Sequence, residues 1–512
     1  MEVNGILKNQ LRSGVIISYI NLAISLLIPF IYTPIMLDML GQSEYGLYSL
    51  AQSAVSYLSL LSFGFGSTII RYIAKYRAEG NKEAVEKTYG FFILLYNVLA
   101  LLVLVVGVAI SHNVEPIFHR GLTLSEQSKM KTLVLIMTFN SALSFPVSVF
   151  SSMITAYERY IYRKLIDMFA TVGAPIANLI ALYLGYASIG MSVAATVIQF
   201  IMLPLYAGYC FKVLKLRPRF SILPKPLIKE LFGFSAFVFL GSLVDMLFWS
   251  TDKVILGMLS SSVAVAIYNV GGTFNNIVMQ LSTSISGVLT PKITGMIVRN
   301  ATKDELTELF IRVGRLQFIV IAIIVSGFTV FGRAFINLWA GAEYADAYWV
   351  TILTMFPLCI PLIQNTGLSI VIAQNKHQFR SIVYLVIAIL NVISTYLVVP
   401  TMGYIGAALC SCISYLLGQG LIMNGYYYKV VGIDIPLFWK NILKLSIIPG
   451  CMMILGLIIS NYYEITGWGV FLSGVVIYSC IYAVLMYSFS LNDYEKDIFR
   501  KPLMKVVGKI FR

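Results

Sequence analysis

Charged side chains are scarce in this sequence. Asp, Glu, Lys and Arg make up 12% of its 512 residues, hydrophobic residues make up 58%, and the mean hydropathy is +0.83. Soluble domains carry about 25% charged residues, so the composition excludes a string of soluble domains, and no nucleic-acid partner is expected. Apolar runs of about 20 residues follow one another along the chain, which predicts an all-α membrane protein with about 14 transmembrane helices.

Residues that bind metals or act in catalysis are also few. The six cysteines lie in or beside apolar runs without metal-ligand spacing, and the three histidines occur singly. We therefore expect no metal site, no disulfide framework and no catalytic residue. A Gly-rich phosphate loop followed by Lys-Ser or Lys-Thr is missing, which excludes ATP hydrolysis by this chain. No cofactor is expected, and a gradient of H⁺ or Na⁺ is left as the energy source.

Positive charge is concentrated on one side of the predicted membrane. The formal net charge is +14, and all but five of the 37 Lys and Arg residues fall in alternate connecting segments. The positive-inside rule then places both termini in the cytoplasm, and the basic segments are expected to attract anionic membrane lipids. The five exceptions are Arg120, Lys129, Lys131 and Arg333 on the outside, and Lys253 within an apolar run.

Polar residues form stripes on two neighbouring apolar runs, 231–258 and 262–290. On each predicted helix they recur at every third or fourth residue and so share one face. A carboxylate at membrane depth normally faces a cavity or a protein interior, so we interpret Asp245, Asp252 and Lys253 as ion-coupling or substrate-binding residues. Hydrogen bonding between helices is the alternative. The predicted cavity lining from these runs is Ser242, Trp249, Asn269, Thr273, Asn276 and Gln280.

The two halves of the chain resemble each other. Asn178-Leu-Ile-Ala-Leu-Tyr-Leu184 matches Asn391-Val-Ile-Ser-Thr-Tyr-Leu397, and other short matches follow in the same order. An even number of helices per half makes the repeats parallel. The predicted division is an N-lobe of six helices at 1–216, a C-lobe of six helices at 226–430, and a further helix pair with a basic cytoplasmic tail at 431–512. The repeat adds Asn21, Ser25, Ser49, Ser53 and Ser56 to the cavity lining.

Several motifs resemble those of bacterial oligosaccharide flippases. They are Thr251-Asp-Lys-Val-Ile-Leu-Gly257 followed by Ala266-Ile-Tyr268, and Leu40-Gly together with Tyr45-Gly-Leu-Tyr48. These flippases export O-antigen or capsule repeat units and belong to the multidrug/oligosaccharidyl-lipid/polysaccharide exporter superfamily. The resemblance implies a V-shaped fold that alternates between inward and outward openings. It also implies a bacterial cytoplasmic-membrane protein that moves a polyprenyl-pyrophosphate-linked oligosaccharide from the inner to the outer leaflet.

The resemblance further implies how the substrate is held. Some relatives bind the pyrophosphate with several cavity arginines, whereas here the candidate phosphate contacts are Arg71, Lys253 and Arg333. In some relatives an extra helix pair offers a groove for the prenyl tail, as the pair after residue 431 would here. We expect a monomer that works with the polymerase and glycosyltransferases of a capsule, O-antigen or teichoic-type pathway.

Two other functions are left open. A cation-coupled multidrug exporter would share the fold but would not need a groove for a lipid tail. A membrane enzyme that polymerises or transfers lipid-linked glycans normally needs sizeable external loops with charged residues, whereas the predicted outside turns of this chain are mostly short and nearly uncharged. The sequence therefore favours a transporter over an enzyme.

Overall fold

The regular structure of the chain is helical, as its composition predicts. The computed structural model describes residues 2–498 and 500, apart from 222–223, 288–289 and 375, and no strand occurs among them. Ten helices of this part are long and apolar enough to cross a membrane, or eleven if one bent pair is a single span. Two of the ten, Ile20–Ala78 and Gln378–Val431, have 59 and 54 residues, whereas one crossing needs about 20. The helix content is therefore consistent with the predicted fourteen spans.

The described chain forms two compact units. The first comprises residues 1–269 and 395–403, and the second comprises residues 270–394 and 404–512. Two helices, α10 (Ser262–Gly287) and α15 (His377–Tyr415), contribute to both units. These bounds differ from the predicted lobes, which follow the sequence repeat and stay a prediction. Most of the predicted basic tail, residues 501–512, lies outside the described residues.

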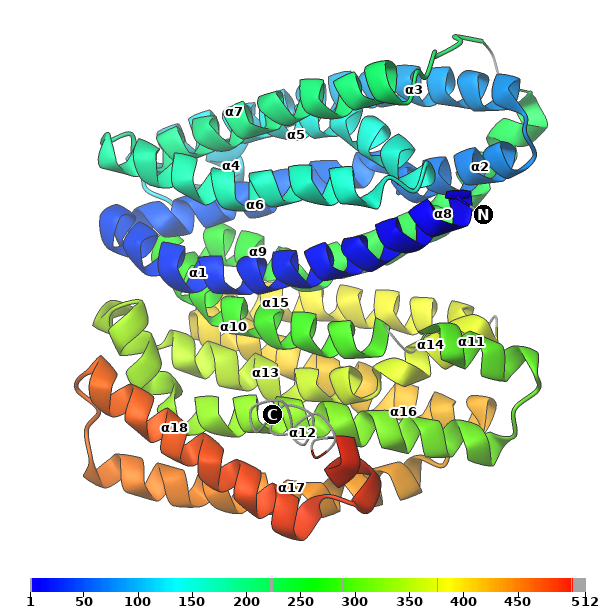
Figure 1. Ribbon diagram of the computed structural model, residues 1–512. Coiled ribbons are helices and arrows are strands. Elements are labelled where there is room, and N and C mark those ends of the chain that lie inside the picture. The colour runs from blue at the N-terminus through cyan, green and yellow to red at the C-terminus, as the bar shows by residue number, and fades with distance from the viewer. Residues whose placement is uncertain (1, 222–223, 288–289, 375, 499, 501–512) are drawn as a thin grey trace, which may run out of the picture. The chain divides into compact units, whose positions relative to one another are not determined.

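The first unit is a bundle of long helices around α5. α5 contacts α1, α2, α3 and α7, and α6 packs against both α1 and α7 (Figure 1). Aromatic rings fill the space between α2, α3 and α5, because the Tyr96 ring lies 6.5 Å from that of Phe65 and 5.8 Å from that of Phe145. The helices of this unit are α1 (Glu2–Ser56), α2 (Phe65–Ala78), α3 (Lys82–His112), α4 (Val114–Phe118), α5 (Leu124–Ala156), α6 (Tyr160–Tyr183), α7 (Ala187–Gly208), α8 (Lys225–Trp249) and α9 (Thr251–Leu259), with short 3-10 and π segments η1 (Tyr57–Ser62) and η2 (Tyr209–Val213).

The long helix α1 is two helices joined without a loop. Gly41 has φ 72° and ψ 171°, outside the helical region, and glycine adopts this positive φ because it has no Cβ to clash. The residues after this break start a second helical segment that continues through η1 into α2. Although α1 is assigned as one helix of 55 residues, the break at Gly41 therefore divides it into two helical spans.

The second unit is built around α12 (Lys303–Trp339). α12 contacts α13, α14, α17 and α18. The other elements of this unit are α11 (Thr290–Val298), η3 (Ala342–Tyr344), α13 (Ala347–Ile363), α14 (Asn365–Ala373), η4 (Leu416–Met423), α16 (Asn424–Tyr426), η5 (Tyr427–Val431), α17 (Ile435–Tyr462), α18 (Trp468–Leu485) and η6 (Met486–Ser490).

The last helix pair, α17 and α18, packs on α12. Ile319 of α12, Leu445 of α17 and Tyr482 of α18 belong to one apolar cluster. Beyond α18, Glu495 accepts hydrogen bonds from Arg315 of α12, at 2.6 Å from Nε and 2.8 Å from Nη2. Both side chains are buried. This ion pair fixes the segment after α18 to α12.

Candidate functional site

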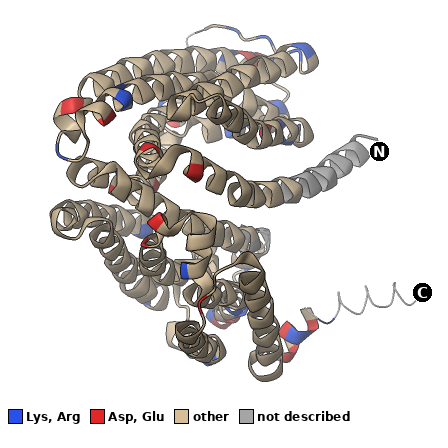
Figure 2. Ribbon diagram, turned by 90° about the vertical axis from the view of Figure 1, so that its left-hand side faces the viewer, with Lys and Arg blue, Asp and Glu red and all other residues tan. Residues whose placement is uncertain are grey.

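A helix break divides the predicted polar face of run 231–258. α8 ends at Trp249 and α9 begins at Thr251. Asp245 is exposed on α8, whereas Asp252, in the first turn of α9, is 1% exposed. Charged residues are few along these apolar helices (Figure 2). The two carboxylates therefore occupy different environments, with Asp252 in the protein interior.

Three helices of the first unit meet at Asp252. Tyr268 of α10 donates its hydroxyl to Asp252 Oδ2 at 2.5 Å, and Thr395 of α15 donates to Oδ1 at 3.3 Å. An ionised carboxylate is costly to bury unless hydrogen-bond donors or cations compensate it. These two hydroxyls supply part of that compensation and place oxygen atoms beside the carboxylate.

The neighbouring cation, Lys253, is held by an amide. Lys253 Nζ donates to Asn269 Oδ1 at 3.1 Å. The amide nitrogen of Asn269 donates in turn to Tyr45 Oη at 2.6 Å and to Ser49 Oγ at 3.1 Å, both on α1. Asn269 thereby connects α9 to α1. Together, the two charged residues and their partners form what we call the central polar cluster: Tyr45, Ser49, Asp252, Lys253, Tyr268, Asn269 and Thr395.

Polar contacts continue along α1 and α2 where they face α8 and α9. Ser56 Oγ lies 3.4 Å from Ser250 Oγ, and the Tyr57 hydroxyl contacts that of Thr251. Farther along α2, further pairs join it to α8: Thr68 with Ser235 at 2.6 Å, and Tyr72 with Glu230 at 2.8 Å. Polar side chains of these two stretches therefore contact each other within the first unit, and Ser56 is the residue among them that belongs to the predicted lining.

Other predicted lining residues of α1 satisfy their hydroxyls locally. Ser53 is buried and donates to Ser49 O at 2.8 Å, and the half-buried Ser25 donates to Leu22 O at 2.9 Å. Such bonds to the preceding turn are common for serine in helices. Asn21, also on α1, is half-buried.

Several predicted residues lie outside the central polar cluster. Asn276 is exposed, whereas Thr273 and Gln280 are half-buried; all three are on the part of α10 that belongs to the second unit. On α8, Trp249 is half-buried and the exposed Ser242 donates to the carbonyl one turn earlier. The structure therefore brings Asp252, Lys253 and Asn269 together in the central polar cluster of the first unit.

The candidate phosphate contacts are divided between the two units. Arg71 is exposed on α2, where its guanidinium lies 4.6 Å from the centre of the Phe234 ring. Arg333 is exposed on α12 in the second unit, 5.9 Å from the ring of Trp349. Lys253 is inside the central polar cluster. The two arginines thus belong to different units, and the guanidinium of each lies beside an aromatic ring.

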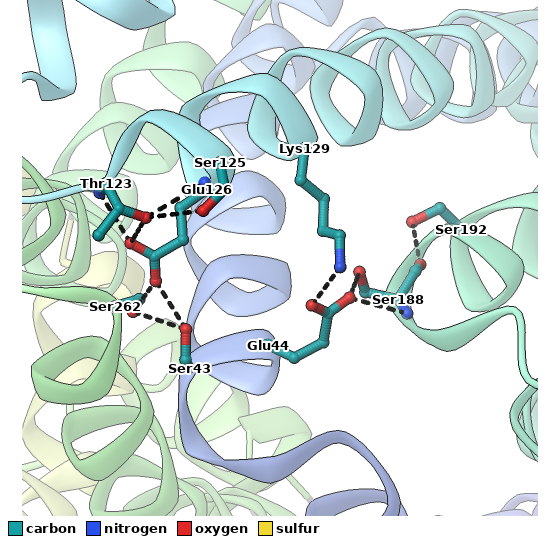
Figure 3. A network of polar contacts seen from close by, with 9 residues as sticks. All are labelled: Ser43, Glu44, Thr123, Ser125, Glu126, Lys129, Ser188, Ser192 and Ser262. Carbon is teal, nitrogen blue, oxygen red and sulfur yellow. Dashed lines mark hydrogen bonds and ion pairs between the residues drawn. The ribbon is translucent and has the colours of Figure 1, made fainter.

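A second network, which the sequence reading missed, surrounds two glutamates of the first unit (Figure 3). Glu44 accepts from Lys129 Nζ at 2.6 Å and from the backbone and hydroxyl of Ser188. Glu126 accepts from Ser43 at 2.6 Å and from Ser262 at 2.5 Å. These residues lie in or beside predicted turns, where charges are expected on the surface, so no local signal marked them.

An apolar cavity lies in the second unit beside the last helix pair. Its volume is about 290 Å³, and α12, α13 and α17 line it. Phe318, Val325, Ile360, Trp439 and Met453 are among the lining residues.

Among the described residues, no group of three or more His, Cys, Asp or Glu is placed to hold a metal ion.

One protein-family model matches the chain. The model described as "Polysaccharide biosynthesis protein" matches residues 11–297, more than half of the sequence. Two relatives are uncharacterized membrane proteins. MJ1068 of Methanocaldococcus jannaschii is 23% identical over 366 residues, covering 70% of this chain and 72% of its own. EpsK of Bacillus subtilis is 21% identical over 495 residues, covering 93% of this chain and 95% of its own.

Solved structures share the fold. The lipid II flippase MurJ in an inward closed conformation is 16% identical, with a TM-score of 0.74 over 96% of this chain and 100% of its own. An inward-facing multidrug resistance MATE family transporter of the MOP superfamily is 13% identical, with a TM-score of 0.62 over 82% of this chain and 99% of its own. At these identities the likeness shows a common fold.

Proposed function

The chain belongs to the polysaccharide biosynthesis protein family, and on that premise we propose that it is a flippase for a lipid-linked oligosaccharide. The substrate would be a polyprenyl-pyrophosphate-linked repeat unit, moved from the inner to the outer leaflet of the cytoplasmic membrane. The product would supply capsule, O-antigen or teichoic-type polysaccharide. The chain acts as a secondary transporter with both termini in the cytoplasm, by alternating access driven by an H⁺ or Na⁺ gradient.

The main structural observation in support of this proposal is the apolar cavity of the second unit. A transporter of soluble drugs has no need for a separate site for a hydrocarbon tail, whereas a prenyl-linked substrate does. The cavity of about 290 Å³ is close to the lower end of ligand pockets, which measure about 300–1,000 Å³. Its size and its lining by aliphatic and aromatic side chains suit a segment of a prenyl chain.

The central polar cluster supplies the coupling part of the proposal. Asp252 is the candidate for binding the coupling cation, because a buried carboxylate beside hydroxyl oxygens attracts a small hard cation or a proton. Two exposed polar side chains, Asp245 on α8 and Asn276 on α10, are candidates for contacts with sugar hydroxyls. Lys253 is the candidate for phosphate, and it would have to leave Asn269 to reach it.

Filling the cavity tests the function. Gly450 lines it, and a Cβ added there meets nothing within 4 Å, so Gly450→Phe places a ring in the space for the tail. In proteoliposomes with a prenyl-pyrophosphate-linked oligosaccharide, we expect about tenfold slower transfer between leaflets, the effect of losing about 1.4 kcal/mol of tail contact.

The matched control is Gly469→Phe. Gly469 is on α18, has no atom within 4 Å of an added Cβ, and does not line the cavity. It should transfer at the unsubstituted rate. Equal rates for both variants would remove the cavity from substrate binding, and absence of transfer by the unsubstituted chain would reject the flippase.

A cation-coupled multidrug exporter is the second candidate. It is favoured by the fold shared with a MATE family transporter. Expression in cells that lack their drug pumps separates the two candidates. Resistance to several drugs, together with normal surface glycan when the chain is deleted, would favour the exporter. Accumulation of lipid-linked oligosaccharide in the inner leaflet after deletion would favour the flippase.

A further inference from the structure

The carboxylate of Glu126 joins three helices of the first unit. One oxygen, Oε2, accepts from the backbone and hydroxyl of Thr123, both at 2.9 Å, and so caps α5. The other oxygen, Oε1, accepts from Ser43 at 2.6 Å and from Ser262 at 2.5 Å (Figure 3). We call Ser43, Glu126 and Ser262 the outer contact. A single side chain thus caps its own helix and holds two others.

The outer contact spans the two predicted halves of the chain. Ser43 lies on α1, just after the break at Gly41, and Glu126 lies in the first turn of α5. Both helices come from the first half of the repeat. Ser262 begins α10, which comes from the second half. The predicted topology places all three residues on the outer side of the membrane.

Glycines bring the backbones around this contact unusually close. A Cβ at Gly46 of α1 would lie 1.8 Å from Ser262 O, and a Cβ at Gly121, just before α5, would lie 2.1 Å from Gly257 O. Any larger residue at these positions would have to push the turn between α9 and α10 away. The turn is therefore seated directly on α1 and on the segment before α5.

The neighbouring glutamate provides an internal comparison. Glu44 has hydrogen bonds of similar number, to Lys129 and Ser188, but these partners lie on α5 and α7. All of these helices belong to the first half of the repeat. Of the two glutamates, Glu126 is thus the one whose bonds reach α10 (Figure 3).

We propose that Glu126 is a positioning residue that keeps the outer side closed by holding Ser262 against Ser43. This rests on the proposed alternating-access transport, in which the outer side must open once per cycle. The contact depends on short serine side chains, so a displacement of the turn by about 1 Å lengthens the bonds beyond about 3.5 Å and breaks them. Opening therefore needs only a small movement of the turn between α9 and α10.

A thiol at position 264, two residues after Ser262 on α10, reports this closure without any transport and leaves the Ser262 hydroxyl in place. Ala264 is 4% exposed, so in Ala264→Cys the thiol should react slowly with a membrane-impermeant maleimide on intact cells. Adding Glu126→Gln removes the charge but retains an oxygen that can cap α5. We expect labelling to become about tenfold faster, because a hydrogen bond to a charged group contributes about 1.5–3 kcal/mol. The unsubstituted chain, whose Cys451 and Cys480 are exposed, gives the background.

Controls separate closure from general stability. Ser188→Ala removes a bond of Glu44 and should leave labelling of the thiol at position 264 unchanged. Ser43→Ala should accelerate labelling, and Ser43→Thr, which retains the hydroxyl, should not. Equal labelling with Glu and Gln at position 126 would overturn the proposal, as would acceleration by Ser188→Ala to the same extent.

A second variant tests the same closure from the backbone. In the Ala264→Cys background, Gly46→Ala should accelerate labelling, because its methyl group would displace the backbone oxygen of Ser262. Gly233→Ala on α8, where an added Cβ meets nothing within 4 Å, should not. If labelling responds as expected but no variant transfers lipid-linked oligosaccharide, the closure stands and the proposed function falls. If transfer is normal and labelling does not respond, the proposed function stands and the proposed closure by Glu126 falls.

Discussion

At the scale of single residues, the adjacent charges Asp252 and Lys253 have different partners. Asp252 is bonded by the hydroxyls of Tyr268 and Thr395, whereas Lys253 is bonded by the amide of Asn269. Neutral groups make these hydrogen bonds, and the two opposite charges, which are adjacent in the sequence, also attract each other. The cluster therefore presents both signs of charge within one turn of α9.

Neutralising Asp252 should uncouple transport from the ion gradient. Asparagine retains an oxygen that accepts from one of the two hydroxyls, and its amide nitrogen can donate to the other, so Asp252→Asn is expected to fold and to reach the membrane at normal levels. Without the charge, we expect at least about tenfold less gradient-driven transfer of lipid-linked oligosaccharide in proteoliposomes, the equivalent of about 1.4 kcal/mol. The measurement compares transfer with and without an imposed H⁺ or Na⁺ gradient.

Asp167 supplies the matched control for that substitution. It also accepts a hydroxyl, from Tyr206 at 2.6 Å, but it lies on α6 outside the central polar cluster. Asp167→Asn should retain stimulation by the gradient. If Asp252→Asn is stimulated as strongly as the unsubstituted chain, Asp252 has no part in coupling.

The sequence predicted some residues of the site and could not predict others. Asp252, Lys253 and Asn269 stood out because polar groups on apolar helices need partners. Thr395 had no such signal, since it is 143 residues from Asp252 and an isolated threonine is common in apolar helices. Asp245 was favoured by its depth in the run; it is exposed, and its role stays a prediction.

At the scale of helices, breaks decide which side chains meet. The run 231–258 predicts one helix, but it contains α8 and α9 with Ser250 between them. The hydroxyl of Ser56 lies 3.4 Å from Ser250, so α1 supplies a partner at the break that the run itself does not reveal. Breaks of this kind follow from tertiary contacts, which explains why hydropathy predicted the spans better than their interruptions.

The ion pair between Arg315 and Glu495 should stabilise the packing of the last helix pair. Breaking a buried pair on one side leaves an uncompensated charge and costs about 3–5 kcal/mol. We therefore expect Glu495→Gln to lower the thermal unfolding midpoint of the detergent-purified protein markedly. The comparison is Lys87 with Glu83, an exposed ion pair, where Glu83→Gln should cost about 0–1 kcal/mol.

Replacing both partners of the buried pair distinguishes charge from packing. Arg315→Met with Glu495→Leu leaves no buried charge, and such apolar replacements are often neutral or stabilising. The double variant should therefore be more stable than Glu495→Gln alone. A double variant as unstable as the single one would show that packing of the guanidinium, rather than ion pairing, matters here.

At the scale of the whole molecule, composition and resemblance predicted most of the fold. The helical structure of the described residues and the membership of the polysaccharide biosynthesis protein family are confirmed. The compact units were not predicted, because nothing in the sequence indicates that α8, α9 and residues 395–403 group with the first helices. An internal repeat specifies related halves but not the contacts between their helices.

The predicted sidedness can be measured by thiol labelling. Ser125 and Ala78 are exposed, in segments predicted to lie outside and inside respectively. An impermeant maleimide should label Ser125→Cys on intact cells, and it should label Ala78→Cys only after permeabilisation. The reverse pattern would place both termini outside and would move the outer contact to the cytoplasmic side.

The pairing of Asp252 with Thr395 has a consequence for biosynthesis. Tyr268 is made 16 residues after Asp252, whereas Thr395 is made 143 residues after it. At roughly 5–20 residues per second, the ribosome needs about 7–30 s to supply that second hydroxyl. During this time Asp252 lies in the translocon or the bilayer without its hydrogen bond from Thr395. Protein truncated before Thr395 is therefore expected to be an early target for membrane quality-control proteases.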